Sequence, residues 1–503
     1  MSRKLIRFSL LSILLLLLNA SYLQASYHYA FNTEVSNSYQ LVTSLRFNEA
    51  YKQLNKLKIS QPDNLAPLIV EDYIDFLALM ISEDNALLKK LSKNKDIRLA
   101  RFLKYGDTSD PYHLFLQAEI YMHWAAVDMR FGNYFSCIKG AYNAYKLLLQ
   151  NQKLFPNFIP NEKNIGLFHV LIGTIPDTYR SSIKLLTGMD GTIDQGLSEI
   201  QSVINYAKKN KFLFADETKI MYAFLLLHIE NQPENAWKKL VSEKIDYDTQ
   251  PLLAYVYANA AFHTMNNDIC ISILEKRNYD AKYFKLDLSN LLLGRAKLNR
   301  LDKDANIYLS KFLQSYMGKS YLKEANMLLN WYYTIFNNLS KANLYRDAVI
   351  KIGSSAQESD KSAIDEMKLY PHYNPILLSA RVLFDGAYSE KALNEISKIK
   401  PNGLQKKDEQ LEYYYRKGRI FQQMKKSKEA KEMFQQVLIN GKNEKYYFAC
   451  NAALQMGTIY EDENQREKAK YYFQLCLDIE PNSYANSLHG RAKAGLQRIK
   501  SNN

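Results

Sequence analysis

Histidine is the side chain most suited to proton transfer and metal binding near neutral pH, and the chain contains eight of them. None stands in an HExxH pattern, and His113 and His123, which fall on one expected helix, lie ten residues apart. We therefore expect exposed or capped helical histidines and no metal site. Residues 188–191 (Gly-Met-Asp-Gly) lack the lysine of a phosphate-binding loop, so they indicate a turn.

The patterns of nucleophilic and nucleotide-dependent enzymes are also missing from the sequence. It contains no GxSxG, no GxGxxG and no GxxxxGK[ST]. Carboxylates such as Asp360 and Glu366 are expected to be ordinary helix-surface residues. We therefore predict no catalytic residues and no cofactor, and a protein that is not an enzyme.

The elements that position the remaining side chains are predicted to be helices. The 503 residues include only 18 Gly and 12 Pro, which is too few for the many tight turns of sandwiches, barrels or doubly wound sheets. With 38 Tyr, 23 Phe and 47% hydrophobic residues, the chain has enough apolar material for a large core. The composition favours an all-α fold built from modules.

An internal repeat is clearest near the C-terminus, where small and aromatic residues recur at fixed offsets. The packing residues of the last unit are Gly457, Tyr460, Ala469, Phe473 and Pro481. Those of the unit before it are Gly418, Phe421, Ala430 and Phe434. Small residues are needed where the backbones of two helices approach, and aromatic rings fill the space beside them. Proline ends the second helix because it lacks an N–H and clashes with the preceding turn.

Residues 450–483 resemble a tetratricopeptide repeat, a unit of about 34 residues. Residues 411–444 look like a second copy. The resemblance implies a tetratricopeptide-type α–α superhelix, or solenoid, of helical hairpins. Weaker copies at the same offsets indicate a degenerate repeat body over residues 26–350 and C-terminal repeats over 377–503. The polar stretch 351–376, which is punctuated by proline, is the candidate hinge between them.

Stacked hairpins of this kind form an extended groove, which the first helix of each repeat lines. On the face of that helix turned away from the second helix stand the candidate partner-binding residues Glu412, Tyr415, Arg419, Gln422, Asn451 and Thr458. Tyr415 and Arg419 are the best anchors, because Tyr and Arg are enriched at binding hot spots. They do not reproduce the Lys/Asn clamp by which some tetratricopeptide proteins hold a terminal carboxylate.

A second resemblance covers residues 164–197. The matching positions are Gly166, Leu167, Phe168, Ile175, Pro176, Leu185, Leu186, Gly188, Asp194, Gly196 and Leu197. In this order they are similar to the core of a eukaryotic tetratricopeptide family linked to inclusion-body clearance. The pattern departs from that family at Asp177, where a second proline would follow Pro176. The resemblance supports a helical-repeat fold and implies no activity.

Residues 1–25 have the pattern of a secretory signal peptide. A basic start at Arg3, Lys4 and Arg7 precedes an apolar run from Phe8 to Leu18, which is shorter than the roughly 17 residues that a membrane-spanning helix needs. Cleavage is expected after Ala20 or Ala25. The sequence therefore predicts an exported protein, periplasmic or associated with the outer membrane, with no transmembrane helix after cleavage.

The charge balance and the cysteines add weaker constraints. Lys and Arg number 66 and Asp and Glu 52, giving a net charge of +14, but the two signs are interspersed. This predicts a mixed, basic surface and no nucleic-acid partner, which would need a basic block with aromatic residues. The four cysteines form no CxxC and are expected to be small buried residues. A disulfide between Cys450 and Cys476 is left open, since an exported protein meets an oxidising compartment.

Two functions agree with these patterns. The first is a non-catalytic scaffold or adaptor of the bacterial cell envelope that binds another protein, such as a component of an envelope or outer-membrane complex. The alternative is a glycan-binding outer-membrane component of the starch-utilisation type built on tetratricopeptide helices. Chain length and Tyr content fit this alternative, whereas the rarity of Trp and the lack of a Cys near the cleavage site oppose it.

Overall fold

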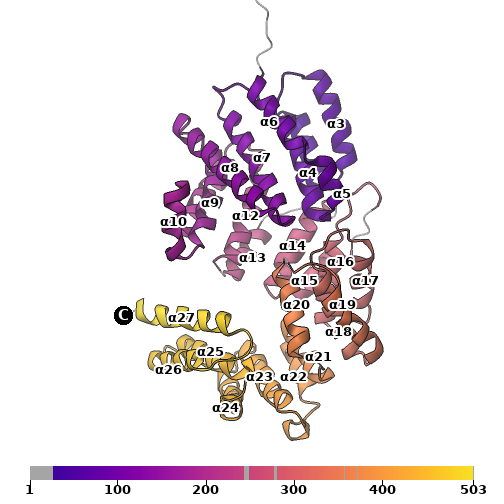
Figure 1. Ribbon diagram of the computed structural model, residues 1–503, viewed down its shortest axis with the longest axis vertical. Coiled ribbons are helices and arrows are strands. Elements are labelled where there is room, and N and C mark those ends of the chain that lie inside the picture. Colours follow the sequence, from indigo (N-terminus) through magenta and orange to yellow (C-terminus); the bar gives the residue numbers. More distant parts are fainter. Residues whose placement is uncertain are drawn as a thin grey trace, which may run out of the picture. The chain divides into compact units, whose positions relative to one another are not determined.

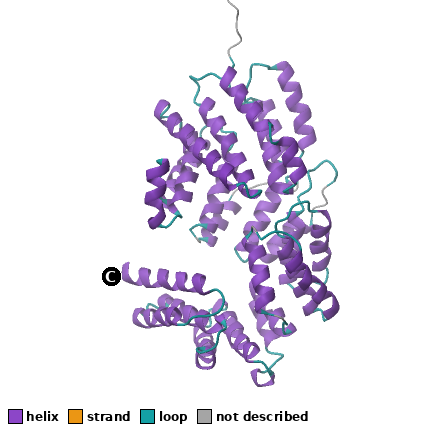
Figure 2. Ribbon diagram, in the orientation of Figure 1, coloured by secondary structure: helices purple, strands orange, loops and turns teal. Residues whose placement is uncertain are grey.

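The computed structural model describes residues 27–230, 232–242, 249–276, 280–355, 357–370 and 372–501. Helices joined by short connections make up this part of the chain, and its isolated β-bridge joins His28 to Asn64 (Figure 2). The predicted all-α class is confirmed. The predicted signal peptide, residues 1–25, lies outside the described residues. A search of the described helices finds none with the length and apolar character required to cross a membrane.

The chain divides into two compact units (Figure 1). Unit 1 comprises Met1–Val256 and Arg277–Leu286, and unit 2 comprises Tyr257–Lys276 and Asp287–Asn503. The helices of unit 1 are α2 (Thr33–Thr43), α3 (Phe47–Ser60), α4 (Pro67–Ser82), α5 (Asn85–Leu91), α6 (Asn94–Tyr105), α7 (Tyr112–Arg130), α8 (Tyr134–Leu154), η1 (Ile159–Asn161), α9 (Glu162–Gly173), α10 (Asp177–Thr187), α11 (Ile193–Ala207), α12 (Ala215–His228) and α13 (Pro233–Val241). Helix α14 (Pro251–His263) begins in unit 1 and ends in unit 2.

Unit 2 continues from α14 as a series of helical hairpins. Its helices are α15 (Asn267–Glu275), α16 (Leu288–Asn299), α17 (Ala305–Ser315), α18 (Leu322–Ile335), α19 (Leu339–Lys351), α20 (Glu358–Leu369), α21 (Pro375–Asp385), α22 (Ser389–Ile396), η2 (Pro401–Gly403), α23 (Lys407–Gln423), α24 (Ser427–Gly441), α25 (Tyr447–Asp462), α26 (Arg466–Asp478) and α27 (Ala485–Ser501). From α16 onward, consecutive helices pair as α16 with α17, α18 with α19, α21 with α22, α23 with α24 and α25 with α26. Each pair contacts the next, as in an α–α solenoid.

The hairpin turns share one backbone geometry although they share no residue type. In the last two hairpins the turn residues Lys425 and Asn464 adopt the left-handed conformation, with φ of 60° and 58°. The amide of the following residue donates to the carbonyl five positions earlier, from Lys426 to Phe421 and from Gln465 to Tyr460. The positions Met265, Leu301, Asn337 and Ala387 repeat this arrangement. This is the Schellman motif, which satisfies carbonyls at a helix end.

Small residues lie at the close approaches within the last two hairpins. A Cβ added to Gly418 would come 2.7 Å from Phe434 Cε1, and one added to Gly457 would come 2.5 Å from Phe473 Cδ1. Ala430 and Ala469 are fully buried. The other predicted packing residues are near these contacts or at a helix end: Phe421 and Tyr460 are half-buried, and Pro481 follows the end of α26. The geometry is that of helices held together through glycine and alanine.

The segment 164–197 forms α9, α10 and α11, and α9 packs along α11. A Cβ on Gly166 would come 2.7 Å from the Gly196 carbonyl oxygen, so the two backbones nearly touch. Glycine at both positions is therefore required for this packing. The relation of the segment to the inclusion-body clearance family stays a prediction.

The candidate hinge 351–376 contains a packed helix. Helix α20 contacts α18 and α19, and its Ala363 and Met367 are buried together with Val349 of α19. It lies between the hairpins α18/α19 and α21/α22, so it is a single helix inserted into the series. The division of the chain into two units runs through the predicted body rather than through this segment. A hinge at 351–376, with domains on either side, stays a prediction.

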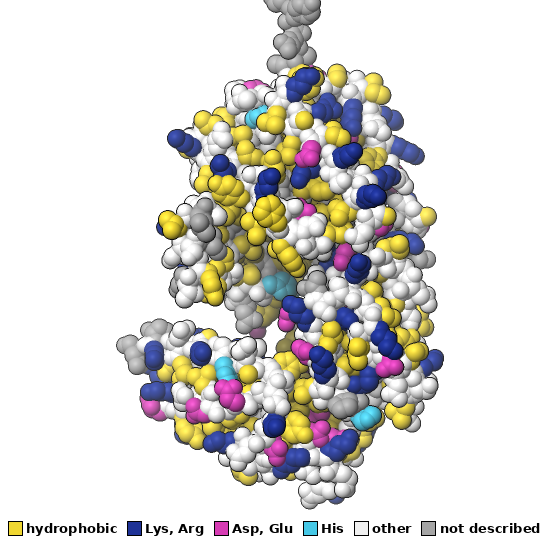
Figure 3. All heavy atoms as spheres, in the orientation of Figure 1, with side chains coloured by type: hydrophobic (Ala, Val, Ile, Leu, Met, Phe, Trp, Pro, Cys, Tyr) yellow, Lys and Arg dark blue, Asp and Glu magenta, His cyan; other side chains and the backbone are white. Residues whose placement is uncertain are grey.

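The cysteines and the surface charges complete the description. All four cysteines are buried and free, and Cys450 Sγ forms a hydrogen bond of 3.5 Å with Cys476 Sγ and no disulfide. Figure 3 shows Lys and Arg side chains spread over the visible face among apolar and uncharged ones.

Candidate functional site

The predicted partner-binding residues lie on α23 and α25, which contact each other in unit 2. Their side chains meet at the Tyr415 hydroxyl. This oxygen accepts a hydrogen bond from Asn451 Nδ2 at 2.7 Å and another from Arg419 Nη1 at 3.1 Å. Three of the six candidate residues are therefore brought into one hydrogen-bonded cluster, and they join neighbouring hairpins.

Burial differs from the prediction of an exposed groove lining. Glu412, Tyr415 and Asn451 are buried, with 8%, 3% and 8% of their surface exposed. Arg419 and Gln422 on α23 are half-buried, as is Thr458 on α25. The first three residues consequently contribute to the packing of the helices. The three half-buried residues remain as the surface that a partner can contact. Partner binding by these residues stays a prediction.

The inserted helix α20 explains why part of the face is buried. Tyr370, which follows α20, donates a hydrogen bond to Tyr447 of α25 at 3.4 Å and belongs to the same apolar cluster as Tyr415. Glu366 of α20 pairs with Arg381 of α21. The sequence indicates a surface position for Glu366, but its exposed fraction is 3%. Helix α20 and its continuation therefore occupy one end of this face.

Charges at this covered end are compensated internally. Burial alone would raise the pKa of Glu366, but the Arg381 guanidinium outweighs it and lowers the pKa below its ordinary value. The Arg381 guanidinium also lies 4.6 Å from the centre of the Trp331 ring. Glu412 accepts a hydrogen bond from Arg416 Nε at 3.0 Å. Each of these two carboxylates has an arginine partner. The Glu366 pair joins α20 to α21, whereas the Glu412 pair lies within α23.

Arg419 of α23 acts electrostatically on Arg491 of the last helix, α27. Partial burial and the positive charge of Arg419 lower the pKa of Arg491, which belongs to α27. Arg419 Nε is buried and has no hydrogen-bond partner among the described residues. Its guanidinium group lies 5.1 Å from the centre of the Phe384 ring. Guanidinium groups form charge-assisted hydrogen bonds with carboxylates, so Arg419 and Arg491 are suited to receive one.

Sequence reasoning missed Arg491 and the residues of α20. Arg491 lies beyond the last repeat that the pattern covers, and only a continuation of the helical pattern could have indicated it. Helix α20 interrupts the repeat spacing, so its polar residues were assigned to a hinge.

Comparison with known proteins finds the tetratricopeptide repeat in the C-terminal part of the chain. A family model described as "Tetratricopeptide repeat" matches residues 411–438 and 451–483. These segments are the α23/α24 and α25/α26 hairpins, so the predicted repeats are confirmed. No curated protein matches the chain.

Among solved structures, the chain is similar to the one titled "Crystal Structure of P58(IPK) TPR Domain at 2.5 A". The two sequences are 14% identical, and the match covers 82% of this chain and 97% of that one with a TM-score of 0.20. The family match gives no support to the glycan-binding alternative.

Proposed function

We propose that the chain is an exported, non-catalytic scaffold that binds another protein of the bacterial cell envelope through its C-terminal repeats. The observation that supports the proposal is the half-buried Arg419 of α23 together with the exposed Arg491 of α27, on which its positive charge acts. Repeat hairpins offer extended surfaces of this kind to other proteins.

The chemistry of the pair indicates which segment of a partner would dock there. A carboxylate compensates two positive charges that act on each other, as those of Arg419 and Arg491 do. Gln422 and Thr458 are half-buried on the same helix faces and can bond to a peptide backbone. The partner is therefore expected to present an acidic side chain in an extended segment.

Photo-crosslinking in cells tests the proposal. A photoreactive residue at Gln422 should trap a defined partner, and Arg419→Ala should lower the yield of that adduct about tenfold, because a charge-assisted hydrogen bond contributes about 1.5–3 kcal/mol. Lys428→Ala removes the same charge from an exposed position on α24 and should leave the yield unchanged. Equal yields from Arg419→Ala and the unsubstituted protein, with both folded, would contradict the proposal.

The proposed location follows from the leader and needs its own test. N-terminal sequencing of the protein from fractionated cells should find it in the periplasmic or outer-membrane fraction, beginning after Ala20 or Ala25. An intact N-terminus in the cytoplasmic fraction would refute export while leaving the binding proposal standing.

A further inference from the structure

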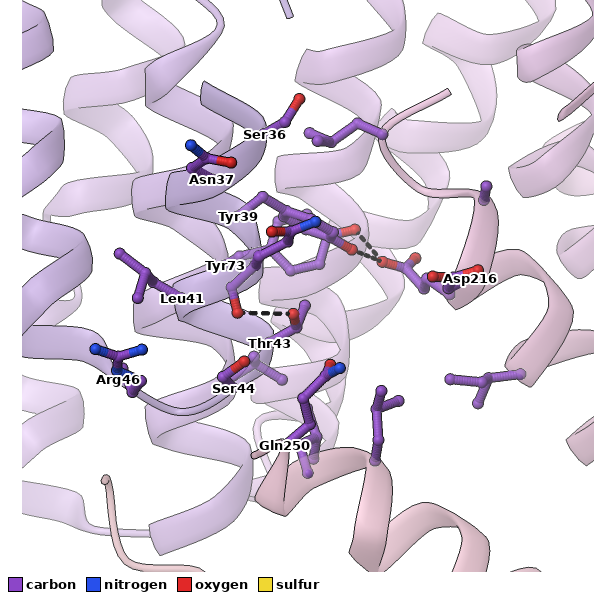
Figure 4. A pocket seen from close by; sticks show the side chains of 18 of the residues that line it. Ser36, Asn37, Tyr39, Leu41, Thr43, Ser44, Arg46, Tyr73, Asp216 and Gln250 are labelled. Carbon is purple, nitrogen blue, oxygen red and sulfur yellow. Dashed lines mark hydrogen bonds between the residues drawn. The ribbon is translucent and has the colours of Figure 1, made fainter. Parts of the chain in front are cut away.

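Unit 1 contains a cavity of about 1120 Å³ between α2, α4, α12 and the beginning of α14 (Figure 4). This volume is at or above the upper end of the range of about 300–1,000 Å³ for small-molecule pockets. Aromatic rings form much of its lining, including Phe31, Tyr39, Tyr73, Phe76 and Tyr112. Uncharged polar side chains such as those of Asn37, Gln40 and Gln250 share the lining.

A carboxylate lies among these rings. Glu217 Oε2 accepts hydrogen bonds from the Tyr39 hydroxyl at 3.0 Å and the Tyr73 hydroxyl at 2.5 Å, which Figure 4 shows as dashed lines. Glu217 Oε1 pairs with Lys163 Nζ at 2.6 Å. The Glu217 side chain is 31% exposed, whereas Lys163 is 2% exposed. The Glu217 side chain therefore lines the cavity, and its cationic partner is buried.

The Glu217 carboxylate stays charged in this position. Burial alone would raise its pKa, but the Lys163 ammonium and the hydrogen bonds from Lys163 and Tyr73 lower it below its ordinary value.

Behind Glu217, a chain of ion pairs extends through unit 1. Lys163 also binds Glu119 at 2.7 Å, and His123 Nδ1 lies 2.8 Å from Asp72 Oδ2 and Nε2 lies 3.7 Å from Glu119 Oε2. Arg98 then joins Asp72 to Asp75, at 2.9 and 2.6 Å. His123, predicted at an exposed or capped position, is buried between two carboxylates.

This network has more acidic than basic groups. Asp72, Asp75, Glu119 and Glu217 supply four carboxylates, whereas Arg98 and Lys163 supply two permanent cations. Even a protonated His123 leaves one negative charge without a counterpart inside the network. Glu217 is the member that lines the cavity, so the excess charge acts on a bound molecule there.

Charged residues at the rim of the cavity do not cancel the excess negative charge of the network. Arg46 forms an ion pair with Glu49, and Lys211 and Asp216, which line the rim, are exposed to solvent. Exposed charges are screened far more strongly than the buried carboxylate. An anionic ligand is therefore disfavoured, and a neutral sugar would gain nothing from the excess negative charge.

We propose that this cavity binds a peptide through a lysine or arginine side chain, whose cationic group approaches Glu217 and whose aliphatic stem packs on the Tyr39 and Tyr73 rings. The aliphatic stem gains apolar contact with these rings in addition to the ion pair of its cationic group. The amides of Asn37, Gln40 and Gln250 can bond to the peptide backbone. The proposed binding of a basic side chain in this cavity does not depend on the proposed function of the C-terminal repeats. The repeats are proposed to bind an acidic side chain, which carries the opposite charge.

Peptide libraries test the proposal without a known partner. The full-length protein without its leader is immobilised and exposed to acetylated pentapeptide amides with randomised flanks and a fixed central Lys, Arg, norleucine or Glu. The retained peptides are quantified by mass spectrometry. The Lys and Arg libraries should be retained at least tenfold more than the norleucine library, and the Glu library least. Equal retention of all four libraries overturns the proposal, as does binding of maltoheptaose without binding of basic peptides.

A pair of matched substitutions locates the binding. Glu217→Gln should reduce the preference for Lys and Arg to near unity, whereas Asp96→Asn, which removes the same charge from an exposed position on α6 outside the cavity lining, should preserve it. An unchanged preference in a folded Glu217→Gln variant overturns the assignment to this cavity. If that variant does not fold, the comparison of the four libraries on the unsubstituted protein still decides the proposal. Arg419→Ala should leave the preference unaltered, so failure of the repeat-face proposal is distinguishable.

Discussion

The ring of Phe473 on α26 is held between two glycines, and this makes its surroundings intolerant of one added methyl group. A Cβ at Gly457 of α25 would come 2.5 Å from Phe473 Cδ1, and a Cβ at Gly495 of α27 would come 2.6 Å from Phe473 Cε2. The ring is fully buried, so it cannot move away from one helix without approaching the other. We predict that Gly457→Ala destabilises the last hairpin.

The magnitude follows from two opposing effects. Alanine gains about 1 kcal/mol over glycine in a helix interior, while overpacking in a filled core costs about 1–3 kcal/mol. Gly490→Ala on α27 is the matched control, because a Cβ there meets nothing within 4 Å. Both substitutions gain helix propensity and only Gly457→Ala overpacks. The free energies of unfolding of the two variants should therefore differ by about 1–3 kcal/mol.

Urea unfolding followed by circular dichroism gives this difference, and hydrogen exchange locates it. Amides of α25 and α26 should lose protection in Gly457→Ala and keep it in Gly490→Ala. Adding Phe473→Leu to Gly457→Ala should cost less than the two single effects together, because the smaller side chain makes room for the methyl group. Equal stability of the two alanine variants, or strict additivity with Phe473→Leu, would refute the packing argument.

Two further predictions concern α20. Asp360 accepts hydrogen bonds from three backbone amides at the start of α18, so Asp360→Ala should lower the free energy of unfolding by about 1–2 kcal/mol and Asp360→Asn by less, as measured by urea unfolding. Glu366 has a lowered pKa in the folded protein, so the unfolded chain takes up more protons as the pH falls. Its contribution is present above about pH 4.3, the ordinary value for Glu, and is lost below it. Glu366→Gln should weaken the acid dependence of unfolding between about pH 5 and pH 3, and an unchanged dependence would contradict the pairing with Arg381.

The repeat packing was predictable because side-chain size decides it. Gly418 and Gly457 stand where only a hydrogen atom fits, so their type and spacing are visible in the sequence. The same offsets in Phe434 and Phe473 follow from the same contacts. This pattern can be recognised within one hairpin, without knowing which hairpin packs beside it. It therefore predicted the fold class and both C-terminal repeats.

The turns were not predictable because backbone geometry, and not residue type, is what they share. Leu301, Asn337, Ala387, Lys425 and Asn464 all adopt positive φ at the same place in successive hairpins. Only asparagine among them favours that conformation. The hydrogen bonds at the helix ends stabilise this conformation in the other turn residues. The turn geometry, which is the most regular feature of unit 2, is therefore not marked by a shared residue type in the sequence.

The burial of the predicted groove residues depended on an element that the repeat pattern could not supply. Tyr415 faces Asn451 as expected for neighbouring repeats, but Tyr370 and Tyr447 close that end of the face. The cavity of unit 1 was missed for a related reason. Tyr39 and Glu217, which meet there, are 178 positions apart in the chain.

These differences separate the residues that determine fold from those that determine recognition. Glycine, alanine and aromatic residues are used inside hairpins, where any array of this type needs them, so they carry no information about a partner. The distinguishing residues are polar, and Glu217 of α12 acts through a helix from another part of its unit, since its partner Lys163 belongs to α9. A buried polar residue that is satisfied by its own chain, such as Glu366, has no binding capacity left. Arg419 and Glu217 differ from it because Arg419 is only half-buried and the Glu217 side chain lines an open cavity. Recognition in this protein is therefore expected where polar groups are incompletely used, and not where the repeat signature is strongest.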